Sequence, residues 1–344
     1  MDGLIDAHAH VVLDATMGAA GAACGPELGY HADGTPWFRV GDWHLDGVRY
    51  EGSPFMNIDL RLQQMEAAGI SAQILSPNPL TYLHFIPAPE AIGYCRRHND
   101  ELAEIVRANP TKLGAFAALP MQDPVVAVEE LRRSVVDLGL LGPYIGTDLG
   151  RTLDDRALDD FYAACVELDV PLMLHPQPSG LDGPLRDPRM RRFDLDLVVE
   201  FSYEELIAVA TVIFGGILHR HPGLDVCVSH AGGSTPMHLA KLEKLAERRA
   251  ASPEWLREPG VFREQLARIW FDLHVTGSRE RAFAVSQLGT DRLVFGTNFA
   301  GWDGGSATVA GELTDTLNDN ATRLFRLAGR APLLIGGAKP SPGR

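Results

Sequence analysis

Short runs of apolar and β-branched residues alternate with amphipathic stretches along most of the chain. Such runs predict strands, and the sequence has eight of them: Gly3–Val11, Ala72–Asn78, Lys112–Pro120, Leu141–Thr147, Pro171–His175, Asp225–His230, Ile269–Val275 and Arg292–Phe299. The stretches that predict helices are Ile58–Ala68, Pro89–Ala108, Val125–Leu138, Leu158–Leu168, Tyr203–Arg220, Thr235–Ala251, Arg279–Leu288 and Ala310–Ala328.

Repeated strand–helix units are typical of an α/β fold with a parallel sheet. Eight of them are expected to close as a (β/α)8 TIM barrel. A doubly wound open sheet is the alternative, and it fits less well because no glycine-rich phosphate turn follows the first run.

One segment breaks the alternation. Residues 12–57 are rich in glycine, alanine, aromatic residues and histidine, and they show no helical period. Because a loop of this length in a compact domain is usually a functional lid or a subunit contact, we expect a long loop insertion after the first strand. We expect residues 1–335 to form one barrel domain and residues 336–344 to be a disordered tail.

The composition is that of a globular protein with an acidic surface. The chain has 344 residues and a formal net charge of -14, which argues against nucleic acid and anionic membranes as partners. No run approaches the roughly 20 apolar residues of a membrane span. The four cysteines form no CxxC pair, and the first residues are neither basic nor strongly apolar, so we expect a reduced, cytoplasmic protein.

Histidines stand at the ends of three predicted strands. The first strand carries Asp6-Ala7-His8-Ala9-His10, and side chains two apart in a strand point to the same side. His175 and His230 end the fifth and sixth strands, where a TIM barrel presents its catalytic residues. Three imidazoles would leave a position on Zn²⁺ open for water or substrate, as in catalytic sites. From spacing alone, His230 could be a ligand, an acid or base, or a structural residue.

Further motifs follow in order along the chain: Arg61–Met65, Gly69–Ile70, Asn99–Ala103, Leu119–Gln122, Ile145–Thr147, His175–Pro176, Gly215–Leu218, His230–Gly233 and Phe295–Thr297. With the first-strand histidines, they resemble the amidohydrolase-2 branch of the amidohydrolase superfamily, and most of all its 2-amino-3-carboxymuconate-6-semialdehyde decarboxylases. The resemblance covers roughly residues 3–330.

The resemblance implies a metal-dependent enzyme in which His8, His10 and His175 are zinc ligands and His230 is the acid/base that handles protons. It also implies a homodimer with a small-molecule carboxylate as substrate. A neutral imidazole beside a metal is suited to proton transfer near pH 7, which agrees with this role for His230. Mn²⁺ or another divalent metal would also suit an imidazole-rich site.

The end of the eighth strand departs from the family pattern. The family usually has an aspartate there, as a metal ligand and partner of the bound water, whereas this chain has Asn298. An amide can coordinate a metal, but it carries no charge and cannot accept a proton. Asn298 could hold substrate or water by hydrogen bonds, or Asp303 could reach back into the barrel mouth. Trp302 beside it is a candidate substrate contact.

The expected carboxylate-binding residues also differ. The resembled decarboxylases bind the substrate carboxylate with two arginines. One aligns near Gly52, where Arg49 is a nearby substitute, and the other, contributed by the partner subunit, aligns with Lys241. Lysine keeps the positive charge but loses the bidentate fork of arginine.

Three functions remain for this pattern. The leading hypothesis is a metal-dependent lyase that decarboxylates an aromatic or ring-cleavage-derived carboxylic acid without oxidation, with His230 delivering the proton. The alternative is a metal-dependent hydrolase or hydratase acting on a C–C, C–O or C–N bond of a ring-cleavage product. The third is a binding protein with a degenerate site, against which the presence of all four histidines argues.

Overall fold

The computed structural model describes residues 3–299, 301, 303–304 and 311–329. All eight predicted strands are present: β1 (Leu4–Val11), β5 (Ile70–Pro77), β6 (Leu113–Ala115), β7 (Tyr144–Gly146), β8 (Leu172–His175), β9 (Val226–Val228), β10 (Trp270–Asp272) and β11 (Leu293–Val294). They pair in parallel as two sheets, with the orders β1–β5–β6 and β11–β10–β9–β8–β7.

Backbone hydrogen bonds join the two sheets at both junctions. The amide of Ala7 in β1 donates to the carbonyl of Phe295 beyond β11 at 2.8 Å, and the amide of Ala117 donates to the carbonyl of Gly142 at 2.8 Å. The strands therefore follow one another around a parallel barrel, and the predicted TIM-barrel fold is confirmed. Nearly every residue of β1, β5 and β8 is buried, as is typical of parallel strands covered on both faces.

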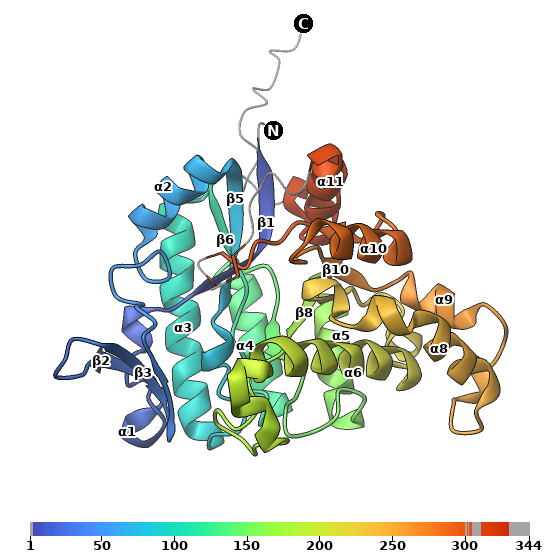
Figure 1. The fold of residues 1–344 in the computed structure, drawn as a ribbon, viewed down its shortest axis with the longest axis horizontal. Helices are drawn as coiled ribbons and strands as arrows, with labels where there is room; N and C mark the ends of the chain where they lie inside the picture. Colours follow the sequence, from blue (N-terminus) through green and yellow to red (C-terminus); the bar gives the residue numbers. More distant parts are fainter. Residues whose placement is uncertain (1–2, 300, 302, 305–310, 330–344) are drawn as a thin grey trace, which may run out of the picture.

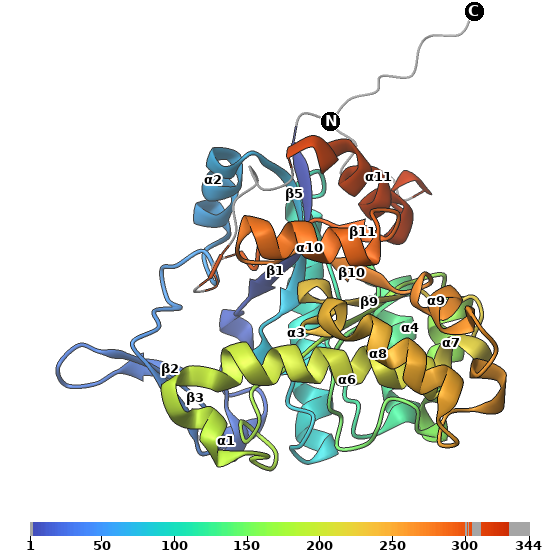
Figure 2. The same ribbon diagram turned by 45° about the vertical axis from the view of Figure 1, so that its right-hand side comes forward.

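Helices surround the strands (Figures 1 and 2). Their bounds are α1 (Gly21–Cys24), α2 (Ile58–Ala68), α3 (Ala88–Ala108), α4 (Pro124–Val136), α5 (Asp159–Glu167), α6 (Phe201–Phe214), α7 (Ile217–Arg220), α8 (Thr235–Arg248), α9 (Val261–Leu266), α10 (Ser278–Leu288) and α11 (Thr314–Leu324). The helix predicted over Tyr203–Arg220 is divided into α6 and α7, because Gly216 between them has a left-handed φ of 69°.

The insertion after β1 differs from the expected irregular loop. It contains a three-stranded antiparallel sheet of β2 (Glu27–Tyr30), β3 (Pro36–Val40) and β4 (Trp43–Asp46), which projects at one side of the molecule (Figure 1). The physical reason is the strand period of β3, in which Phe38 and Val40 are buried while their neighbours are only partly covered. A test for helical period alone does not detect this alternation.

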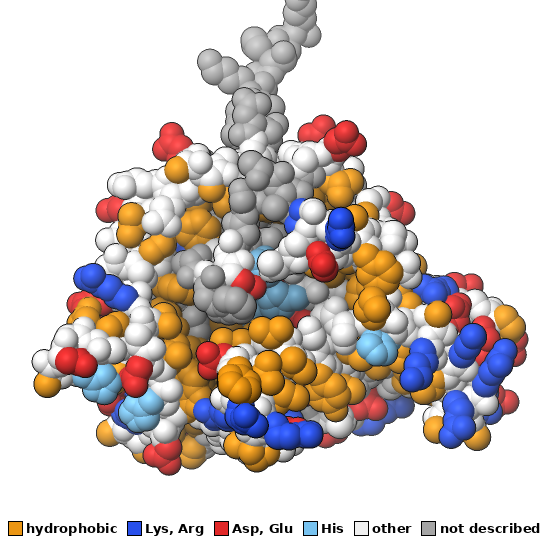
Figure 3. Space-filling model, viewed as in Figure 1, with side chains coloured by type: hydrophobic (Ala, Val, Ile, Leu, Met, Phe, Trp, Pro, Cys, Tyr) orange, Lys and Arg blue, Asp and Glu red, His pale blue; other side chains and the backbone are white. Residues whose placement is uncertain are grey.

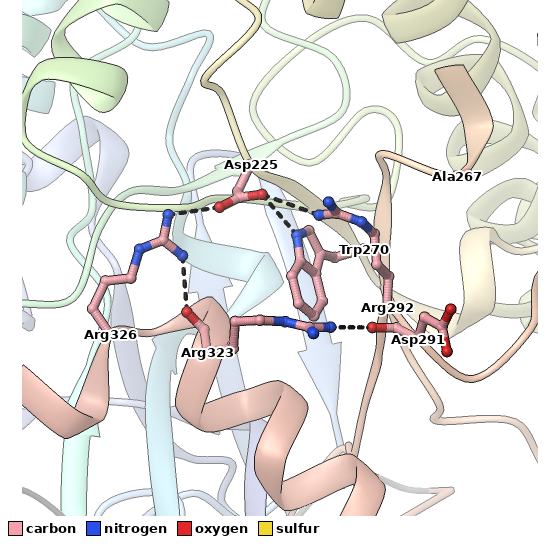
Figure 4. Close-up of a pocket in the computed structure, with 7 residues that line it drawn as sticks. All are labelled: Asp225, Ala267, Trp270, Asp291, Arg292, Arg323 and Arg326. Carbon is pink, nitrogen blue, oxygen red and sulfur yellow. Dashed lines mark hydrogen bonds and ion pairs between the residues drawn. The ribbon is translucent and has the colours of Figure 1, made fainter. Parts of the chain in front are cut away.

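A group of arginines lies at the end of the barrel where β9, β10 and β11 begin. The guanidinium carbons of Arg292 and Arg323 lie 4.8 and 4.9 Å from the ring centre of Trp270 (Figure 4). Asp225 accepts hydrogen bonds from the indole of Trp270 at 2.8 Å, from Arg292 at 3.2 Å and from Arg326 at 2.7 Å. One carboxylate thus ties together the starts of three strands and the segment after α11.

Replacing Asp225 with alanine is expected to lower the free energy of unfolding by about 2 kcal/mol, because three donors lose a charged acceptor that is only partly exposed to water. Urea unfolding followed by circular dichroism measures this loss. Asp291→Ala is the matched control: this neighbouring side chain is exposed and has no ion pair among the described residues, so a change within about 0.5 kcal/mol is expected. Equal losses in the two variants would contradict the role given to Asp225.

Candidate metal centre

Two buried histidines come from β1. His8 and His10 are 1% and 3% exposed, and their Nε2 atoms lie 3.0 Å apart. Nitrogen ligands bind Zn²⁺ at about 2.0–2.1 Å, so two ligands of one ion lie roughly 3–3.5 Å apart. The alternation of side chains in the strand therefore brings both imidazoles together at a separation that suits one cation.

His175 at the end of β8 and His230 after β9 complete the cluster. The ring centres of His175 and His230 lie 5.0 and 4.9 Å from that of His8. One ring nitrogen from each of these three residues lies within 4.8 Å of the other two. Figure 3 shows histidine side chains in a hollow on the face of the molecule viewed there. The strand ends thus gather the four predicted histidines in one place.

Backbone carbonyls hold two of the imidazoles. Nδ1 of His10 donates to the carbonyl of Pro77 at 3.0 Å, and Nδ1 of His175 donates to the carbonyl of Pro176 at 2.6 Å. Burial, followed by the nearby histidines, lowers the pKa of both imidazoles well below the ordinary value. Each ring is therefore neutral, with Nδ1 protonated and the lone pair of Nε2 free, which is the form that a metal requires.

Asp272, the last residue of β10, holds the third imidazole. Its Oδ2 accepts from Nδ1 of His8 at 2.9 Å, and its Oδ1 accepts from the backbone amides of His230 and His274, each at 3.0 Å. Burial lowers the pKa of His8 to about 4 although the charge of Asp272 opposes this. Burial would raise the pKa of Asp272, but the charge of His8 and the hydrogen bond with it are stronger and lower that pKa.

Below the histidines, a polar network connects β1, β5, α2 and the segment after β11. The buried carboxylate of Asp6 accepts from the hydroxyl of Thr297 at 2.6 Å and from the amide of Gln73 at 2.9 Å. Arg61, fully buried on α2, donates to Gln73 at 2.9 Å and to the carbonyl of His10 at 2.5 Å. Burial raises the pKa of Asp6 to about 6. The first-strand motif is thus anchored from beneath by hydrogen bonds.

His230 has a carboxylate partner. Its Nδ1 donates to Oε1 of Glu205 on α6 at 2.5 Å. Burial alone would lower the pKa of His230, but the charge of Glu205 and the hydrogen bond to it outweigh burial and raise this pKa to about 9. Among the four predicted histidines, this is the ring whose pKa is raised, whereas burial lowers the pKa of His8, His10 and His175.

Asn298 and Asp303 lie beside a fifth histidine. The amide of Asn298 donates to Oδ1 of Asp303 at 2.6 Å, and Nε2 of His274 donates to Oδ2 at 3.1 Å. The ring centre of His274 is 5.4 Å from that of His230 and 5.6 Å from that of His8. Burial would raise the pKa of Asp303, but the hydrogen bond from His274 and the charge of that ring outweigh burial and lower the pKa to about 2. The carboxylate of Asp303 therefore lies within hydrogen-bond distance of both Asn298 and His274.

The remaining predicted residues lie elsewhere. Arg49 is exposed and donates to the carbonyl of Glu51 at 3.1 Å. Lys241 is exposed on α8. Within the described part of the chain, neither residue hydrogen-bonds or ion-pairs with the histidine cluster. Trp302 lies outside the described residues, as does the predicted tail.

Sequence reasoning missed two residues of the site. His274 follows β10 by two positions, so the rule that histidines at strand ends gather at the barrel mouth could have found it. Glu205 gave no such signal, because it lies within a helix 25 positions before His230 and meets it only in the folded chain.

The donor set fits a divalent metal. Nε2 of His8 lies 3.0 Å from Nε2 of His10, and the ring of His175 lies beside both. Each of the three rings is oriented through Nδ1 by a carboxylate or a carbonyl, an arrangement that metal-binding histidines almost always have. Imidazole suits zinc, copper, iron and nickel, and the nearby carboxylate also suits manganese.

Comparisons with known proteins agree with this chemistry. A 2-amino-3-carboxymuconate-6-semialdehyde decarboxylase of Dictyostelium discoideum is 29% identical over 284 residues, which cover 81% of this chain and 76% of the relative. A 2,6-dihydroxybenzoate decarboxylase complexed with 2,6-dihydroxybenzoate is 26% identical, with a TM-score of 0.65, over 80% of this chain and 90% of that chain.

A further solved structure shares the fold. It is a dihydroxybenzoic acid decarboxylase of Polaromonas sp. JS666 with bound manganese and the inhibitor 2-nitroresorcinol, and it matches with a TM-score of 0.71 and 22% identity over 98% of this chain and 100% of that chain. The family model described as amidohydrolase matches residues 5–327. This chain therefore belongs to the amidohydrolase family, and decarboxylases are among its relatives.

Proposed function

We propose that this chain is a metal-dependent lyase that removes CO2 without oxidation from an aromatic or ring-cleavage-derived carboxylic acid. The observation that carries the proposal is the cluster of three neutral, buried imidazoles beside His230, whose hydrogen bond with Glu205 raises its pKa. Such a site combines a place for a metal with a proton donor. The decarboxylases among the relatives supply the reaction class.

In this proposal His8, His10 and His175 hold Zn²⁺ or Mn²⁺. When bound, a divalent cation supplies positive charge that attracts the substrate carboxylate with an adjacent oxygen and stabilises negative charge developing during the reaction. Asp272 and the two proline carbonyls keep the rings fixed for this task. Burial of the histidines excludes bulk water, which strengthens every electrostatic interaction in the site.

His230 acts as the acid. The bond between the substrate carbon and its carboxylate breaks, and the electron pair stays on that carbon while CO2 leaves. A proton from Nε2 of His230 then forms the new C–H bond, and solvent returns a proton to the ring before the next turnover. General acids of this kind contribute typically 10²–10⁴-fold to the rate.

Asn298 and Asp303 lie beside His274, whose ring centre is 5.4 Å from that of His230. The bond between them keeps the amide of Asn298 oriented, so its oxygen remains available to a substrate hydroxyl or to water. We propose this binding role for Asn298 and a charge-balancing role for Asp303, which faces the ring of His274. We also propose Trp302 as a substrate contact, because it lies beside Asp303 in the sequence.

We further propose a homodimer. Val198, Val199, Tyr203 and Ile207 are 43–54% exposed and follow one face of α6 and the π-helical turn before it, Asp196–Glu200. Figure 3 shows hydrophobic side chains gathered below the hollow that contains the histidines. A second copy of the chain would cover this apolar face.

We assign the two cations expected to bind the substrate carboxylate, Lys241 and Arg49, to the dimer interface and to the insertion after β1. Helix α8 contacts α6, and it carries Lys241. We propose that Lys241 of one subunit serves the carboxylate in the other, with Arg49 as the cation of its own subunit. All four cysteines are free, which is typical of the reducing cytoplasm, the compartment we propose.

Purified wild-type protein is expected to contain about one divalent metal ion per chain, as a site of this type binds one ion. His8→Ala combined with His10→Ala should lose the metal and all release of CO2 from hydroxylated aromatic acids, because both β1 ligands are removed. Elemental analysis and CO2 detection measure this. His219→Ala, which changes an exposed histidine stacked on Trp255, should retain both properties.

Full metal content in the double variant would contradict the ligand assignment. Incorporation of labelled oxygen from water into the product, without CO2, would favour the alternative hydrolase or hydratase.

His230→Asn should lower kcat on the order of 10²–10⁴-fold while the metal content stays at the wild-type level, because the proton donor is lost and the three ligands remain. Steady-state kinetics together with elemental analysis separate the two possible roles of this residue. Loss of the metal in this variant would instead make His230 a ligand, in agreement with its proximity to His8 and His175.

A further inference from the structure

Glu205 has a buried carboxylate whose hydrogen bonds go to residues outside its own helix. It lies on α6 and is 1% exposed. Its Oε1 accepts from Nδ1 of His230 at 2.5 Å and from the hydroxyl of Ser229. Its Oε2 has no hydrogen-bond partner among the described residues, and no lysine or arginine in that part of the chain pairs with it.

Such burial is costly without a compensating positive group. A carboxylate without a cation strongly disfavours burial, so the stability of the fold alone would favour an apolar residue here. The adjacent Glu204 shows the ordinary solution, since its carboxylate pairs with Arg186 at 2.8 Å. The one ion pair of Glu205 within the described residues is with His230. Its position is therefore explained by His230.

The backbone around His230 leaves space for this contact. His230 has a φ of 48°, and its amide is held by Asp272 at 3.0 Å. At Gly233, which has a φ of 60°, a Cβ atom would lie only 2.7 Å from Oε2 of Glu205. The turn after β9 is thus shaped so that a carboxylate from α6 can reach the imidazole. The backbone fixes the position of His230, and Glu205 fixes the rotation of its ring.

We propose that Glu205 is a positioning residue for proton transfer, which keeps the proton of His230 on Nδ1 and directs Nε2 toward the substrate. This inference rests on the proposed function and deepens it, since it names the group that selects the reacting nitrogen. A neutral histidine has two tautomers, and the acceptor on one nitrogen decides which is formed. With Glu205 on Nδ1, Nε2 is the nitrogen that exchanges a proton with substrate.

Glu205→Gln tests this inference, because glutamine keeps the shape but can offer its NH2 group to Nδ1 and so favour the wrong tautomer. We expect kcat to fall on the order of 10²-fold or more, with KM and metal content unchanged. Glu204→Gln, the matched control on the same helix, should change kcat less than threefold.

A double variant separates positioning from a structural effect. In a His230→Asn background, Glu205→Gln should have no further effect on the residual rate, because the group it positions is already absent. An equal additional loss in that background would overturn the inference, and so would loss of metal from Glu205→Gln alone.

A direct measurement covers the case in which the glutamine variant does not fold. Nitrogen-15 spectra of histidine-labelled, metal-loaded wild-type protein, with the His230 signals assigned from His230→Asn, report which ring nitrogen is protonated. At a pH at which the ring carries a single proton, that proton on Nδ1 supports the inference, and a bare Nδ1 overturns it. This result is independent of the reaction: if no acid in the panel releases CO2, the proposed function fails while the position of the proton is still decided.

Discussion

The site depends on one buried carboxylate, Asp272. It accepts from the ring of His8 and from the backbone amides of His230 and His274, and so connects the ends of β1, β9 and β10. A charge at this depth is stable only because its acceptor positions are used, and the positions of three histidines follow from that requirement. The barrel supplies the strand ends, and Asp272 fixes how the residues there are oriented.

The imidazoles of the cluster differ in the group that accepts a hydrogen bond from Nδ1. Carbonyl oxygens hold His10 and His175, which burial keeps neutral, whereas the carboxylate of Glu205 holds His230 and favours its protonated form. Similar residues at similar depth therefore have opposite pKa shifts. The partner of Nδ1 does not decide the state of a ring alone, because His8 also faces a carboxylate, that of Asp272, and burial still lowers its pKa.

Asn298 is uncharged at a position where the family usually has an aspartate, but other carboxylates lie nearby. Asp303 lies within hydrogen-bond distance of both Asn298 and His274, five residues further along the chain. The negative charge is displaced to the side of the cluster that faces His274. Five imidazole rings then share the barrel mouth with two carboxylates, Asp272 and Asp303, in addition to Glu205 behind His230.

The sequence by itself determined the eight strands, the surrounding helices and the four histidines at the strand ends, because hydrophobic period and side-chain alternation are local properties. It did not reveal the sheet of β2–β4, whose strands are stabilised by pairing with one another, or Glu205 and His274, whose roles depend on partners distant in the chain. Only the tertiary structure decided those contacts, since hydrogen bonds between separate elements form after the barrel has brought the elements together.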